Sequence, residues 1–171
     1  IGARCLMTGG VYWYIMCMRY TLGGPGEVSA RFSVDGTLPD MVPRYNISPT
    51  QEVPLIYNEN GKTRCIMARW GLVPSWKQNA KSGEWLFNAR AETLAEKPAF
   101  KGLLSDSRCI LPASGFYEWK HERGRKFPYY LFVRGAPLFG CAGLYDRWTP
   151  PGSNEEIMTC VMVTCAANPL V

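Results

Sequence analysis

Short apolar or alternating segments, separated by turn-forming residues, make up most of the chain. Residues 52–57 (EVPLIY) are mostly apolar, the turn sequence NENG follows, and a second mostly apolar segment runs through CIMARW, so this part predicts a β-hairpin. Further strands are predicted at residues 108–113, 115–120, 128–133, 138–145 and 157–165. The pattern therefore favours a fold built mainly from strands.

Helical periodicity is confined to two segments. Val28 and Phe32 stand four residues apart within residues 25–34, and residues 94–104 place apolar residues at a similar spacing. Because the strands mostly follow one another along the chain, we expect an α+β fold. Its mainly antiparallel sheet would curl into an open barrel with helices at the side.

The composition is that of one globular domain. The chain has 171 residues, of which 47% are hydrophobic and 19% charged, enough to bury a core without disulfides or metal ions. The net charge of +5 fits a polyanionic partner but serves solubility equally well. Cysteines such as Cys109 and Cys160 lie in apolar segments, and no C-x-x-C pair occurs. We therefore expect small core residues in a reducing, cytoplasmic environment.

Several kinds of site are excluded by what the sequence lacks. His121 is the only histidine and the cysteines are not clustered, so we expect no metal site. The motifs G-x-x-x-x-G-K-[ST], G-x-G-x-x-G and G-x-S-x-G are all missing, and we expect no cofactor. His121 stands in the charged turn KHERGRK, where a solvated side chain is expected rather than half of a catalytic pair.

The two ends of the sequence depart from an ordinary domain. Residues 1–15 are apolar but broken by Gly9 and Gly10, too short for a membrane span and without the layout of a signal peptide. We expect a leader, either a translated upstream region or an added segment, followed by a single domain over residues 16–171. The final VTCAANPLV carries no terminating signal, and we expect the domain to be truncated there.

Two polar segments could contact a ligand. If FNARAET (residues 87–93) is extended, Asn88, Arg90 and Glu92 lie on one side of it. They would form either a solvated strand edge or a cluster that grips a phosphate and a sugar. RYNISP (residues 44–49) is by itself typical of a turn that joins a strand.

Glu118 stands between two aromatic residues in ASGFYEWK. In a strand it shares a face with Phe116, and partial desolvation would raise the pKa of its carboxyl and suit it to general acid–base catalysis. The alternative is an edge-strand carboxylate paired with Lys120 or Arg123, and the sequence leaves both open.

Cys17 follows Met16 in MCMR, a start at which methionine removal leaves a free N-terminal cysteine. Part of such an α-amine is neutral at pH 7, so it can condense with an aldehyde. The neighbouring thiol can then close a five-membered thiazolidine ring, which no internal cysteine can do. The alternative is a buried strand cysteine.

Together these segments resemble the SRAP family, the SOS-response-associated peptidase proteins. The matching segments occur in the family's order and cover essentially residues 16–171: MCMR, RYNISP, ARWGLVPSW, FNARAET, CILPASGFYEWK and VTCAANPLV. A single motif would be weak, but several in order are specific. The resemblance implies a SRAP-like α+β fold.

The resemblance also implies a function in the DNA damage or SOS response, in which the protein binds single-stranded DNA and cross-links to abasic sites. Cys17 would form a thiazolidine with the ring-opened sugar, Asn88 matches the family's active-site asparagine, and Glu118 matches its catalytic glutamate. Further DNA contacts are implied for Arg19, Asn46, Pro49, Trp76 and Arg90. We expect a monomer that acts on DNA and not on a membrane, associated with the nucleoid if the source is bacterial.

Three features depart from the family pattern. The family's histidine motif, H-x-R-M-P, would follow the AANPLV segment, but the sequence ends at Val171. Met18 replaces the usual glycine after Cys17, and its side chain could crowd the pocket. Residues 1–15 precede Met16, and Cys17 has no free amine while they stay attached.

Two other functions stay open on the sequence alone. A peptidase that removes its own leader would use Cys17 as an N-terminal nucleophile, and a strand-cleaving lyase reaction would draw on the same site. A passive single-stranded DNA-binding module would hold DNA through Arg19, Arg90 and Trp76 without chemistry, and its binding would be salt-sensitive.

Overall fold

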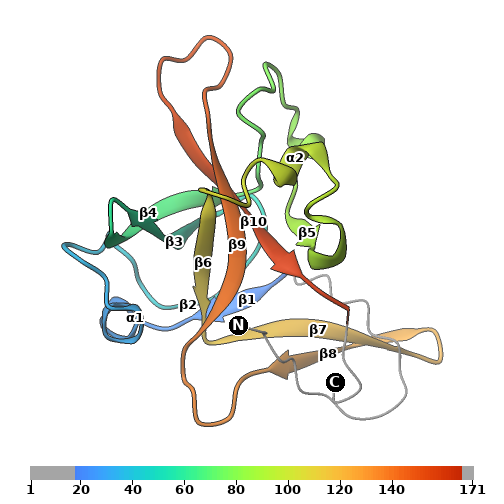
Figure 1. Cartoon of the computed structure of the whole chain (residues 1–171). Coiled ribbons are helices and arrows are strands. Elements are labelled where there is room, and N and C mark those ends of the chain that lie inside the picture. Colours follow the sequence, from blue (N-terminus) through green and yellow to red (C-terminus); the bar gives the residue numbers. More distant parts are fainter. Residues whose placement is uncertain (1–17, 167–171) are drawn as a thin grey trace.

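The computed structural model describes residues 18–166, and strands dominate it (Figure 1). The strands are β1 (Tyr20–Leu22), β2 (Arg44–Ile47), β3 (Glu52–Glu59), β4 (Lys62–Trp70), β5 (Asn88–Arg90), β6 (Arg108–Ala113), β7 (Gly115–Glu122), β8 (Arg125–Leu131), β9 (Phe139–Trp148) and β10 (Ile157–Thr164). The helices are α1 (Pro25–Phe32), α2 (Pro98–Lys101) and the 3-10 turns η1 (Ser82–Glu84) and η2 (Ala91–Thr93). The predicted α+β class and the predicted hairpin at β3–β4 are confirmed.

Five strands form a barrel in the order β4-β3-β6-β9-β10. Neighbouring strands in this series pair antiparallel, as predicted. The two ends of the curled sheet are joined by a short parallel pairing of β10 with β4, at Thr159–Arg69 and Cys160–Trp70. Parallel strands are joined by long connections and not by a short turn, so the pairing of β10 with β4 could not be predicted from the local sequence.

A second sheet, in the order β2-β1-β7-β8, lies against one end of the barrel (Figure 1). Only Ser114 separates β6 of the barrel from β7 of this sheet. The Ser114 backbone N–H donates to the Thr21 carbonyl (2.8 Å), and its hydroxyl accepts from the Gly23 backbone N–H (2.9 Å). These bonds fix the position of β1 beside β7.

Two apolar clusters hold the fold together. The larger fills the barrel and reaches the second sheet, where the rings of Tyr20 and Trp70 meet edge to face at 5.4 Å. The smaller lies outside the barrel around Phe100, Leu144 and Val161. Because β10 sends alternate side chains into each cluster, it is buried on both sides, which accounts for its continuous apolar sequence.

The first predicted helix is confirmed as α1, but the second is shorter than the predicted residues 94–104. Lys97 keeps an extended backbone before Pro98, as residues that precede proline usually do, and α2 ends at Lys101. The apolar spacing in this segment instead reflects packing of Phe100 and Leu103 on the smaller cluster. Within residues 18–166, no helix is long and apolar enough to cross a membrane.

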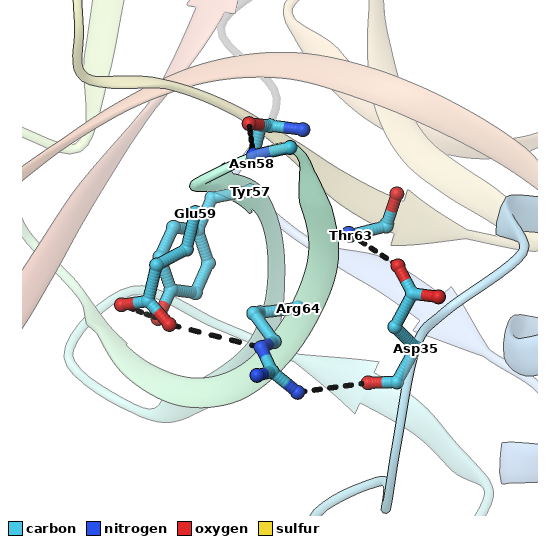
Figure 2. A network of polar contacts seen from close by, with 7 residues as sticks. Asp35, Tyr57, Asn58, Glu59, Thr63 and Arg64 are labelled. Carbon is cyan, nitrogen blue, oxygen red and sulfur yellow. Dashed lines mark hydrogen bonds and ion pairs between the residues drawn. The ribbon is translucent and has the colours of Figure 1, made fainter.

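The connection from α1 to β2 is tied to the β3–β4 hairpin (Figure 2). Asp35 and Thr63 exchange two hydrogen bonds, from the Asp35 backbone N–H to the Thr63 carbonyl (2.8 Å) and from the Thr63 N–H to Asp35 Oδ2 (2.7 Å). Arg64 donates to the Asp35 carbonyl (3.4 Å) and lies 3.7 Å from the Glu59 carboxylate. This contact anchors the segment that leads into β2 and Asn46.

Candidate functional site

The segment before β1 runs along β7. Tyr20 pairs with Phe116, and the Tyr117 backbone N–H donates to the Arg19 carbonyl at 2.9 Å. Continuing this antiparallel register by one further residue puts Met18 opposite Glu118. Cys17 is the residue covalently joined to Met18, and it lies outside the described residues.

Asn88 approaches Met18 from the barrel side. Its strand, β5, pairs parallel with β10, and the Phe87 carbonyl accepts both the Trp70 indole N–H (2.9 Å) and the Met162 backbone N–H (3.1 Å). In this position Asn88 Nδ2 donates a hydrogen bond to Met18 Sδ at 3.3 Å. Asn88 Oδ1 is buried and has no hydrogen-bond partner among the described residues. A buried acceptor without a partner is costly and is typical of a site that receives a polar ligand.

Glu118 is the buried carboxyl of this site. Its residue is only 6% exposed, and burial raises its pKa to about 7, although a hydrogen bond from the Trp119 backbone lowers it in part. Glu118 Oε1 has no hydrogen-bond partner among residues 18–166. Lys120 instead pairs with Glu122 at 3.2 Å, so the alternative of a surface Glu118–Lys120 ion pair is wrong.

The chemistry available here is proton transfer. A carboxyl whose pKa is about 7 is present in both forms at neutral pH, and it can therefore donate and accept a proton in one reaction. The strand register places Met18 opposite Glu118, and Met18 accepts a hydrogen bond from Asn88.

Arg19 and Asn46 lie together on the second sheet. Arg19 Nη1 donates to Asn46 Oδ1 at 2.8 Å, and both side chains are exposed. The hydroxyl of Tyr117 on β7 donates to the Tyr45 carbonyl on β2 (3.2 Å), across the intervening strand β1. Arg19 and Asn46, which the family resemblance implies as DNA contacts, thus lie together, and Arg19 directly follows Met18.

Arg90 shares the side of β5 that carries Asn88, because the intervening Ala89 is buried in the smaller apolar cluster. Glu92 does not join them, contrary to the prediction from an extended FNARAET. The chain turns into η2 after Arg90, and the Glu92 carboxylate accepts the Ala166 backbone N–H at 2.8 Å. The pKa of Glu92 is lowered, first by this hydrogen bond.

Pro49 and Trp76 lie on loops, outside the strands that carry Asn88 and Glu118. Pro49 precedes Thr50, whose backbone N–H donates to the Trp70 carbonyl at 2.7 Å. Trp76 is 67% exposed on a loop fixed by a hydrogen bond from the Ser75 backbone N–H to Asp146 Oδ2 (2.7 Å). Its open ring is free to stack on a planar ligand.

Thr164 adds a polar group that the sequence did not single out. It pairs with Arg90 across β10–β5, so both side chains lie on the side of the strands that carries Asn88. Its hydroxyl is buried and has no hydrogen-bond partner among the described residues. Thr164 stands in the mostly apolar sequence of β10, so nothing in the sequence indicated that it belongs to this site. Its place follows from the pairing of β10 with β5.

Three other cysteines are confirmed as core residues: Cys65, Cys109 and Cys160. Burial raises the pKa of the Cys65 thiol to about 11 and that of the Cys160 thiol to about 12, and it raises the pKa of Cys109 well above the usual value. All three stay protonated at neutral pH, and a thiol in that form is a poor nucleophile.

These features describe a strand-rich protein whose buried carboxyl and amide flank the start of its first strand. Residues 16–171 match the family model described as SOS response associated peptidase (SRAP), and the chain belongs to this family.

Named relatives and a solved structure agree with the family. The chain is 39% identical over 160 residues to "Abasic site processing protein YoqW" of Bacillus subtilis (strain 168), covering 91% of this chain and 71% of that one. It is 38% identical over 157 residues to YoaM of the same organism, named in the same way, with 90% and 69% covered. A crystal structure of a Bacteroides thetaiotaomicron protein superposes with a TM-score of 0.78 at 30% identity, covering 87% and 68% of the two chains.

Proposed function

We propose that this protein processes abasic sites in single-stranded DNA by forming a covalent thiazolidine cross-link through Cys17. The observation that carries the proposal is the buried Glu118 carboxyl, with a pKa of about 7, opposite the residue that follows Cys17. The names of the relatives, abasic site processing proteins, supply the substrate class.

The proposed reaction has three steps. Glu118 assists the opening of the abasic sugar, which exposes an aldehyde, and the Cys17 amine adds to its carbon to give a carbinolamine. Glu118 then protonates the departing hydroxyl, so that water leaves and an imine remains. The Cys17 sulfur adds to the imine carbon and its proton passes to nitrogen, which closes the ring with the net loss of one water.

Asn88 has a positioning role in this scheme. Its Oδ1 is buried without a partner and can accept a hydrogen bond from the Cys17 amine or a sugar hydroxyl, and its Nδ2 already contacts Met18. The buried hydroxyl of Thr164 lies on the same side of the strands and can accept or donate a further bond. Together these groups would hold the open sugar facing the amine.

Further DNA contacts would come from other polar and aromatic side chains of the chain. Arg19 and Arg90 would bind phosphates, Asn46 would orient Arg19 through their hydrogen bond, and Trp76 would stack on a base. Pro49 would lie against the bases. All of these contacts are independent of sequence, as a sensor of damage requires.

The reaction needs Cys17 at the N-terminus. We propose that residues 1–15 form a leader outside the single domain at 16–171, and that removal of residues 1–16 frees the amine. The test is a denaturing gel of this chain, begun at Cys17, after incubation with single-stranded DNA that carries one abasic site. A retarded band is expected for the native sequence and for Cys165→Ala, but not for Cys17→Ala. An equal band for both variants would refute the proposal.

The same site supports a second candidate, self-processing by a peptidase. Glu118 could activate Cys17 to cleave the peptide bond before it, since a carboxyl of pKa about 7 can accept the thiol proton. Intact mass of the purified chain with its leader distinguishes the two. Slow appearance of a species that begins at Cys17, absent in Glu118→Gln, would favour self-processing. A passive binding module would give neither this species nor a covalent band.

A further inference from the structure

The hairpin of β7 and β8 continues beyond the site as an arm (Figure 1). β8 is the edge strand of its sheet, and nearly all of its side chains are exposed. Residues 120–131 contain four cationic side chains and one carboxylate, a net charge of +3 in a chain whose total is +5. Most of the protein's excess positive charge is therefore concentrated in this arm.

The strand register separates the side chains of the arm into two faces. On the face of Glu118, Tyr129 is paired with Glu118 itself, Phe127 with Lys120, and Arg125 with Glu122. We call Tyr129, Phe127, Lys120 and Arg125 the Glu118 face. Outward from the buried carboxyl, Tyr129 comes first, Phe127 and Lys120 form the next pair on this face, and Arg125 lies at the pair beyond.

On the opposite face of the arm Tyr130 contacts the rest of the protein, although Tyr130 and Phe132 also stay 45% and 65% exposed. The Tyr130 hydroxyl shares a hydrogen bond with the Thr21 hydroxyl (2.8 Å), and its ring lies 5.1 Å from Tyr117 and 6.1 Å from Phe132. Phe127 on the Glu118 face is 43% exposed.

We propose that the Glu118 face of the arm binds the DNA strand that flanks the abasic nucleotide. Tyr129 and Phe127 stack on successive bases, and Arg125 and Lys120 contact the phosphates. The inference rests on the proposed function, because it takes the abasic sugar to lie at Glu118. Aromatic rings interleaved with cations along a strand are the combination that binds single-stranded nucleic acid without sequence preference.

The dimensions suit a short stretch of DNA. Four residues separate Glu118 from Glu122 at the end of β7, or about 13 Å along a strand. About four stacked nucleotides cover this length at roughly 3.4 Å each. Glu122 pairs with Lys120 at an exposed position, where such a pair contributes little, so a phosphate can displace the carboxylate.

The experiment compares matched variants on the two faces of β8. The 171-residue chain is titrated into a fluorescent 15-nucleotide oligothymidine, and binding is followed by anisotropy at several salt concentrations. Phe127→Ala removes a ring from the Glu118 face, and Phe132→Ala removes a ring that is 65% exposed from the other. Arg125→Ala and Lys126→Ala remove neighbouring cations from opposite faces. Circular dichroism checks that each variant is folded.

We expect Phe127→Ala to weaken binding about five-fold or more, the lower end of what one stacked base contributes, and Phe132→Ala to change it less than about two-fold. Arg125→Ala should reduce the slope of log affinity against log salt by about 0.7, and Lys126→Ala by less. Equal effects of the two members of each pair would overturn the inference. If the chain begun at Cys17 still cross-links abasic DNA in that case, the proposed function survives. If the native chain neither binds nor cross-links, both fail.

Discussion

Substitution of Glu118 by glutamine tests the desolvation of the carboxyl. Glutamine keeps the shape but cannot ionise. The folded-state pKa of about 7 lies above the ordinary value of 4.5, so folding opposes ionisation of this group. Below pH 4.5 the carboxyl is protonated in both states and has no effect. As the pH rises from 4.5 to 7, the unfolded chain ionises first and the native protein loses stability, and above pH 7 the penalty stays constant.

The magnitude follows from the two pKa values. Between pH 5 and pH 8 the native protein should lose about 2 to 3 kcal/mol of unfolding free energy through this group, and Glu118→Gln should escape that loss. The variant should therefore gain stability relative to the native protein as the pH rises, although it should lose cross-linking by roughly 100-fold or more. A gain in stability that accompanies a loss of function would mark a carboxyl kept for catalysis.

The assay is urea unfolding at pH 5 and pH 8, followed by circular dichroism. Taking the difference between variant and native protein at each pH cancels the titration of all other groups. Glu122→Gln is the matched control, because this carboxylate is exposed on the same hairpin and paired with Lys120. Its difference should not change with pH by more than a few tenths of a kcal/mol. A pH-independent difference for Glu118→Gln would refute the desolvation of the carboxyl.

Three further predictions concern the same region. The cross-linking rate should be bell-shaped in pH, rising as the amine loses its proton and falling as Glu118 ionises, and stopped-time gels of Glu118→Gln should lack the falling limb. Met18→Gly removes the hydrogen bond between Asn88 Nδ2 and Met18 and should speed cross-linking roughly 2- to 10-fold, because a hydrogen bond contributes about 1 kcal/mol. Slower cross-linking by this variant would show that Met18 supports the site. Gly115→Ala places a methyl group against the Tyr130 ring and should lower the unfolding free energy by about 1–3 kcal/mol in thermal melts, whereas Gly124→Ala, with φ of +75° but open space, tests the turn alone.

The local part of the fold could be predicted from the sequence, and the non-local part could not. The hairpin at β3–β4 follows from two mostly apolar segments and from a turn ending in Asn60-Gly61, both of which have positive φ. The parallel contacts of β10 with β4 and β5 join residues about 75 to 90 positions apart. Hydrophobic periodicity cannot predict contacts between residues so far apart in sequence. The pairing of β10 with β5 is nevertheless what places Thr164 opposite Arg90.

The site shows the same division. The alternation along β7 was enough to predict that Glu118 shares the buried side of Phe116. Asn88 was placed by the family resemblance, and its contact with Met18 depends on the indole of Trp70 holding the Phe87 carbonyl. Glu92 was predicted on the wrong side because strand alternation stops where the chain turns into η2.

Intact mass spectrometry tests the central claim most directly. The chain begun at Cys17 is mixed with an abasic single-stranded oligonucleotide, denatured without any reductant and weighed, and the adduct is then mapped by peptide fragmentation. The account predicts a species whose mass is the sum of protein and DNA less one water, with the modification on residue 17 and none in Cys17→Ala. An adduct that persists in Cys17→Ala, or one attached to a lysine and stable only after reduction, would contradict it.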